Sequence, residues 1–310
     1  MEEFANWIMD ELEKLLGEDY WMKYMEMEKG NGKIYHGILI AKETDDIGPL
    51  VYIDFYMKKY QEGSLTIPEI ASAILYQIKQ HPAPVSATER IQKHYDEIRE
   101  EIRTAVCNYM ANEEDLRYIP HRRLLDLAAF YYLPLQGENG WDGVIRINYQ
   151  LLEDWNITED ELVRQAESNF SRLEDCRVIS ARRFMENMLI KHLGPEKTEM
   201  LKKRKLRLLD VKAQIVSNKE HYWGACFLAN HAVLQCLADS LQDDLVIFPL
   251  SVHEIVVVKL QDYGEFPITP DDLEEINNVK VAREDRLSNN IYLYSRDREK
   301  LMIYMEGGLL

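Results

Sequence analysis

Residues 222–260, YWGACFLANHAVLQCLADSLQDDLVIFPLSVHEIVVVKL, hold the most distinctive pattern of the chain. Small residues open an apolar run that predicts a helix over residues 224–240. Two short apolar runs follow at residues 245–248 and 255–258, and their length and β-branched content predict buried strands. A turn at residues 249–254 joins them. The stretch therefore predicts a C-terminal unit of mixed α and β structure.

The same stretch contains a thiol and an imidazole that could act together. Cys226 lies at the predicted helix start, where the helix dipole lowers the pKa of a thiol. His253 lies at the mouth of the following strand, where it could serve as a base, with Glu254 or Asn218 orienting its ring. One reading is thus a cysteine-dependent hydrolase or acyl transferase with a papain-like or transglutaminase-like arrangement.

A structural role explains the same residues without any catalysis. The predicted helix is apolar on most faces, and a buried cysteine behaves as a small hydrophobe. Ser251 and His253 can satisfy backbone groups of the turn. Neighbouring strand residues point to opposite faces, so His253 and Glu254 share one site only if a bulge intervenes. We therefore predict no catalytic residue, with Cys226 and His253 as the alternative pair.

A third reading is a binding site around this turn for a protein or a small ligand. Its wall would be formed by Trp223, His253 and the last hairpin of the chain. The predicted binding residues are Asn218, Trp223, Gly224, Ser251, His253 and Glu254.

The first 80 residues predict an α-β-β-β-α unit. Residues 4–16 place Phe4, Ile8, Leu12 and Leu15 on one helical face. A hairpin follows over residues 20–41, with Lys29-Gly-Asn-Gly-Lys33 as its turn. Residues 50–55 predict a third strand. Thr66 and Glu69 form a capping box for a helix that ends near residue 80.

Prolines at residues 81–85 cannot continue a helix and mark the first predicted boundary. The predicted domains are residues 1–85, a mostly helical middle with one hairpin at residues 86–209, and an α+β unit with a small sheet at residues 210–310. The remaining predicted elements are helices at 86–102, 149–155, from 158, at 180–193, 195–206 and from 269, and strands at the aromatic end of 123–135 and at 143–147, 213–217, 291–294 and 301–304. The fold class is α+β.

Composition restricts the classes of partner. The 310-residue chain carries a formal net charge of -17 and has a pI near 5.0, which repels phosphate backbones and favours a basic protein partner. The basic run at residues 202–207 is interpreted as a solvated helix end. Apolar runs are too short for a membrane span, and the acidic N-terminus differs from a signal peptide. We predict a cytoplasmic protein that binds neither nucleic acid nor membrane.

Cysteine and histidine spacing predicts neither disulfides nor a metal site. Cys107, Cys176, Cys226 and Cys236 are scattered, and the eight histidines form no ligand pattern. Phosphate-binding glycine motifs are missing from the sequence, so no cofactor is predicted.

Aromatic residues suggest an interaction surface. The chain has 18 tyrosines, and aromatic side chains gather in residues 52–60 and 130–132. Tyrosine combines an apolar ring with a polar tip and is enriched at protein interfaces. The leading functional interpretation is a non-enzymatic protein-binding or adaptor module.

The chain resembles an uncharacterised bacterial family, the domain of unknown function numbered five-six-eight-eight, over nearly its whole length. The phrases that carry the resemblance are Arg122-Arg-Leu-Leu-Asp-Leu-Ala128, Ile147-Asn-Tyr-Gln-Leu-Leu-Glu-Asp-Trp-Asn-Ile-Thr158, Trp223-Gly-Ala225, Ser251-Val-His-Glu254 and residues 269–301. The resemblance implies that the Gly-Ala helix start and the Ser-Val-His-Glu turn belong to a shared scaffold. It also implies a small apolar residue where this chain has Cys226, which argues against a family-wide cysteine mechanism.

Overall fold

A computed structural model describes residues 1–44, 48–80, 93–137, 140–170, 176–183, 212–264 and 268–304. The chain forms two compact units, one of Met1–Gln92 with Leu135–Gly143 and one of Lys93–Pro134 with Val144–Leu310. The predicted boundaries at 85/86 and 209/210, the helix at 195–206 and the basic run at 202–207 lie outside the described residues. The division into three domains stays a prediction.

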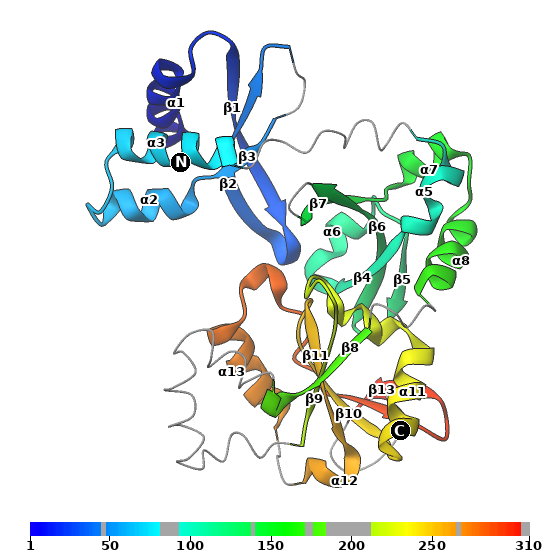
Figure 1. Ribbon diagram of the computed structural model, residues 1–310. Helices are drawn as coiled ribbons and strands as arrows, with labels where there is room; N and C mark the ends of the chain where they lie inside the picture. Colours follow the sequence, from blue (N-terminus) through cyan, green and yellow to red (C-terminus); the bar gives the residue numbers. More distant parts are fainter. Residues whose placement is uncertain are drawn as a thin grey trace. The chain divides into compact units, whose positions relative to one another are not determined.

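The first unit packs helices against one side of a small antiparallel sheet (Figure 1). Its elements are α1 (Glu2–Leu16), β1 (Tyr20–Lys29), β2 (Lys33–Lys42), β3 (Leu50–Tyr52), α2 (Asp54–Gln61) and α3 (Ile67–Gln80). Phe4, Ile8 and Leu12 of α1 are buried as predicted, whereas Leu15 is exposed. The hairpin turns at Asn31, which has the positive φ that such turns need.

The strand expected over residues 50–55 is shorter than predicted, because a helix begins at Asp54. The Asp54 carboxylate accepts hydrogen bonds from the His36 backbone N–H and from His36 Nδ1, each at 2.9 Å. An acid in the first turn of a helix is favoured by the helix dipole, so this contact fixes the start of α2. The predicted cap of α3 is confirmed, since Thr66 N–H and Oγ1 donate to Glu69 at 2.8 and 2.7 Å.

The second unit begins with a four-stranded antiparallel sheet covered on one face by helices (Figure 1). Its elements are α5 (Tyr95–Ile98), η2 (Arg99–Glu101), β4 (Arg103–Asn108), α6 (Glu113–Leu116), β5 (His121–Leu124), β6 (Leu127–Gly137), β7 (Gly140–Arg146), α7 (Tyr149–Trp155) and α8 (Glu159–Phe170). The end of β6 and the start of β7, within Leu135–Gly143, are the part of this sheet that is counted with the first unit. The helical middle thus also holds a sheet, of which the sequence predicted only the β6–β7 hairpin. The helix expected to run through residue 102 ends earlier, because β4 starts at Arg103 and pairs with β6.

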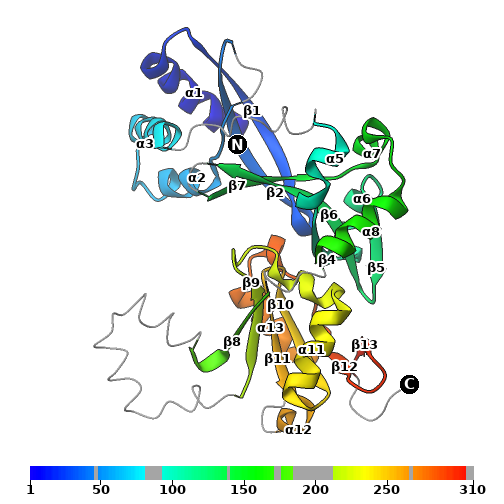
Figure 2. The same cartoon turned by 45° about the vertical axis from the view of Figure 1, so that its right-hand side comes forward.

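A six-stranded antiparallel sheet completes the second unit, in the order β13-β12-β10-β11-β9-β8. Its strands are β8 (Cys176–Ser180), β9 (Gln214–Asn218), β10 (Leu245–Ser251), β11 (Glu254–Lys259), β12 (Tyr292–Ser295) and β13 (Lys300–Ile303). One face packs on η6 (Gly224–Ala229) and α11 (His231–Leu241), the other on α12 (Leu260–Tyr263) and α13 (Pro270–Lys280), as Figures 1 and 2 show. The α+β class is confirmed.

The helix predicted over residues 224–240 is divided in two. Asn230 separates the 3-10 helix η6 from α11, and its side-chain oxygen accepts from Val233 N–H at 3.1 Å. Asparagine is a preferred N-cap, so the break follows from this residue. Its amide also donates to Phe170 O at 2.6 Å, which ties the start of α11 to the end of α8.

The two sheets of the second unit are joined by a polar network at Asp126, in the turn between β5 and β6. Its carboxylate accepts from Ser288 Oγ at 2.6 Å, Asn290 Nδ2 at 3.0 Å and Tyr292 Oη at 2.7 Å. Ser288 and Tyr292 are buried, so these charge-assisted bonds hold the segment before β12 against the first sheet. Throughout the part of the chain described above, helices lack the combined length and apolarity that crossing a membrane requires.

Candidate functional site

The loop between β9 and η6 closes on itself through Asn218. The Asn218 amide donates to Tyr222 O at 2.6 Å, and its oxygen accepts from Tyr222 N–H at 3.1 Å. The next residue, Trp223, adopts a left-handed conformation with φ of 54° and turns the chain into η6. Asn218 is buried, so its predicted binding role competes with these local bonds.

Gly224 is the point of closest backbone approach in this region. A Cβ built on it would meet His253 O at 2.5 Å and Asn218 N at 2.7 Å, and would lie closest of all to Ser217 Oγ. Two of these atoms belong to backbone, which cannot swing away as a side chain can. Gly224 therefore lets η6 pack directly on the end of β9 and on the β10–β11 turn, where only glycine fits.

His253 links that turn to two other segments. Its Nδ1 accepts a hydrogen bond from Trp223 N–H at 3.2 Å, and its Nε2 lies 3.2 Å from Asp285 Oδ1. Because Nδ1 accepts, the ring proton of the neutral imidazole belongs on Nε2, where it can be donated to Asp285. Both ring nitrogens are thus engaged with the protein framework.

The hairpin turn itself uses Ser251 as the structural reading predicted. Ser251 Oγ accepts from His253 N–H at 3.1 Å, and Ser251 pairs with Glu254 across the hairpin. The register shift of this hairpin lies between Phe248 and Ser251 on β10, so it does not supply the bulge that His253 and Glu254 would need to share one site. Glu254 is half-buried, and burial raises the pKa of its carboxyl group, while His221 and His253 partly offset the shift.

Aromatic rings surround Trp223. Its ring centroid lies 4.7 Å from that of Tyr132, 5.3 Å from Phe130 and 4.9 Å from Tyr222. Tyr222 also contacts the His253 ring, at 5.6 Å. Phe130 and Tyr132 are buried, so this aromatic run belongs to the core, and Tyr222 forms the exposed edge of the cluster.

The Cys226 thiol lies in the core. Its residue is 5% exposed, and burial raises the pKa of the thiol; a smaller upward effect comes from Cys176 and a downward one from Arg103. The expectation that a helix start lowers this pKa is wrong, because desolvation in the apolar core outweighs the helix dipole.

The structure therefore brings the six predicted binding residues into one region, where most of their contacts are hydrogen bonds that hold the loop and the hairpin turn together.

Sequence reasoning missed Asp285, which contacts His253 from η7 (Arg283–Asp285), and Tyr222, an exposed aromatic residue of the same region. Asp285 stands in a polar run with no local signal that would connect it to a histidine 32 residues earlier. Among the described side chains, His, Cys, Asp and Glu form no group of three that could hold a metal ion.

Comparison with known proteins gives one result. A family model described as "Family of unknown function (DUF5688)" matches residues 1–296. No curated protein and no solved structure shows a significant match to the chain.

Proposed function

The chain belongs to DUF5688, a family of unknown function, and we propose from its exposed side chains that it is a non-enzymatic protein-binding module. Family membership confirms the resemblance seen in the sequence, but the family description names no activity. The proposal therefore depends on which side chains the chain exposes and which it buries.

Four exposed aromatic side chains lie on the helices of the first unit. We call them together the aromatic helix surface: Trp7 of α1, Phe55 and Tyr60 of α2, and Tyr76 of α3, with exposed fractions of 41%, 63%, 38% and 68%. The rings of Trp7 and Tyr60 are 6.2 Å apart. Phe55 contacts Tyr56 at 5.7 Å.

This exposure is the observation that supports a binding role. Large aromatic side chains cost free energy when they face water, and exposed groups of them mark interaction sites. Trp and Tyr also dominate the energetics of protein interfaces. Of the two aromatic runs singled out in the sequence, residues 130–132 are core, whereas Phe55 and Tyr60 of residues 52–60 face solvent.

The contacts of the second unit weigh against the cysteine-hydrolase alternative. A nucleophilic thiol needs a lowered pKa and an adjacent base. Burial raises the pKa of Cys226, and both ring nitrogens of His253 are engaged by Trp223 and Asp285.

Affinity capture with matched variants tests the proposal. Three tagged proteins are compared: the wild type, a Phe55→Ser/Tyr60→Ser double variant and a Val279→Ser control. Each captures partners from a lysate of the organism that supplies the sequence, and mass spectrometry identifies and quantifies the captured proteins. Val279 is 68% exposed and lies on α13 of the other unit. We expect the wild type and the control to capture the same proteins. The double variant should capture at least ~5-fold less of each, which corresponds to a loss of about 1 kcal/mol in binding free energy. An unchanged set of captured proteins would contradict the proposal, provided that all three melt at similar temperatures.

A further inference from the structure

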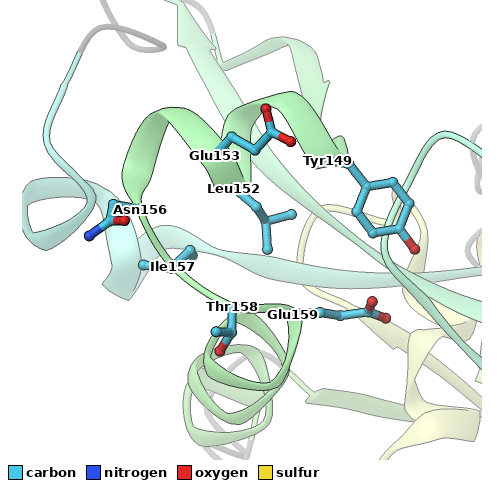
Figure 3. A pocket seen from close by; sticks show the side chains of 7 residues that line it. All are labelled: Tyr149, Leu152, Glu153, Asn156, Ile157, Thr158 and Glu159. Carbon is cyan, nitrogen blue, oxygen red and sulfur yellow. The ribbon is translucent and has the colours of Figure 1, made fainter.

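The corner between α7 and α8 contains an open groove of about 510 Å³ (Figure 3). This volume falls within the range of about 300–1,000 Å³ that ligand pockets occupy. The lining residues are Tyr149, Leu152, Glu153, Asn156, Ile157, Thr158 and Glu159. The first four are spaced at i, i+3, i+4 and i+7, so they lie on one side of α7 and its end.

Local sequence signals fix the shape of this groove. α7 ends at Trp155, and the next residue, Asn156, takes a left-handed conformation with φ of 54° and donates its N–H to Glu153 O at 3.0 Å. α8 begins after Thr158, whose N–H donates to Glu161 Oε2 at 2.8 Å in a capping box. The connection is therefore short and held at both ends, which keeps the two walls of the groove in place.

The groove combines an apolar floor with an acidic rim. Leu152 and Ile157 lie in its middle, and Tyr149 and Glu159 lie together at one end (Figure 3). Desolvation raises the pKa of the Tyr149 hydroxyl, and the charge of Glu159 and its hydrogen bond with Tyr149 add to this shift. Glu153 is exposed at the rim.

Positive charge is missing from the lining residues themselves. Arg122 lies near this corner but pairs with Asp160, with an N–O distance of 3.7 Å. Two carboxylates beside an apolar floor are thus left without a cation among the groove's own side chains. A ligand that supplies both an aliphatic chain and a positive charge would complement them.

We propose that this groove takes an arginine or lysine side chain from a basic segment of a partner protein. The aliphatic stem would cover Leu152 and Ile157. The charged end would bind Glu159 and Glu153 and contact the half-exposed Tyr149 ring. The net charge of -17 favours approach of a basic segment. The groove lies on the second unit, whereas the aromatic helix surface lies on the first. An experiment can therefore refute one of the two proposals without affecting the other.

Fluorescence anisotropy with a pair of peptides tests this inference. The probe is a labelled eight-residue peptide with two arginines among apolar residues, and its control has both arginines replaced by citrulline, which has the same shape without the charge. The protein is used as the wild type, as a Glu153→Gln/Glu159→Gln variant and as a Glu274→Gln/Glu275→Gln control. Both variants remove two negative charges, and Glu274 and Glu275 are exposed on α13.

At 150 mM salt, we expect the wild type and the α13 control to bind the arginine peptide at least ~10-fold more tightly than the citrulline peptide. The groove variant should lose this preference to within ~2-fold. Two results would overturn the inference: a preference that persists in the groove variant, which would assign the binding to general surface charge, or a wild type that does not discriminate between the peptides. Circular dichroism checks that the groove variant remains folded.

Discussion

Replacement of Gly224 by alanine should destabilise the second unit strongly. The new Cβ would lie 2.5 Å from His253 O and 2.7 Å from Asn218 N, and closer still to Ser217 Oγ. Overpacking of a dense core costs about 1–3 kcal/mol, and more where backbone must move. Asn218 is paired with Cys176 across two strands, and His253 sits in a tight hairpin turn. We therefore expect a cost of about 3 kcal/mol.

The matched control is Gly264→Ala, the same chemical change in the same unit. Gly264 follows α12 with φ of -62° and ψ of -18°, and its built Cβ has no neighbour within 4 Å. Alanine adopts this conformation without strain and lowers the entropy of the unfolded chain, so the variant should be unchanged or up to about 1 kcal/mol more stable.

Differential scanning calorimetry measures both variants. For a unit of this size, about 3 kcal/mol corresponds to a fall in Tm of about 6–12 °C. Adding Ser217→Ala to Gly224→Ala should restore only part of the loss, because the two backbone contacts remain and the bond from Ser217 Oγ to His253 O at 2.7 Å is removed. A Gly224→Ala protein that melts within about 2 °C of the wild type would show that the close approach around Gly224 is not tightly packed.

Two further predictions concern ionisable groups of the same region. Iodoacetamide at neutral pH should modify exposed Cys236 in the folded protein but modify buried Cys226 only after unfolding, because the thiolate is the reactive form and burial raises the pKa of Cys226. Peptide mapping by mass spectrometry gives the modification rates of both cysteines from one sample. Equal rates in the folded protein would favour the cysteine-hydrolase alternative. Glu254→Gln should raise the unfolding midpoint at pH 7, because a carboxyl group whose folded pKa lies above its ordinary value of 4.5 destabilises the fold once it ionises. The gain in stability should disappear as the pH falls below 4.5, where the Glu254 carboxyl group is protonated in both the folded and the unfolded chain. Denaturant titrations at pH 7 and pH 4 measure the difference. A variant less stable than the wild type at pH 7 would mean that the Glu254 carboxylate is favourably paired.

Local signals in the sequence were sufficient for many elements. The caps at Thr66, Thr158 and Thr269 fall where predicted, since a capping bond joins residues three positions apart and needs no distant partner. The hairpin around Asn31 follows from its glycine-flanked turn in the same way.

The candidate site was predicted in part for a similar reason. Trp223, Gly224, Ser251 and His253 all lie in the stretch whose small residues and strand signals were recognised, and the structure brings them into contact. Their binding role stays a prediction.

By itself, the sequence determined the α+β class, the first hairpin, the starts of α3, α7, α8 and α13 and the region of the candidate site, because spacing and caps act over a few residues. Only the tertiary structure decided that residues 103–108 form a strand, that Asp285 meets His253, and that residues 130–132 are core while Phe55 is exposed. Strand pairing, ring contacts and desolvation depend on residues far apart in the chain, whose proximity is created only by folding.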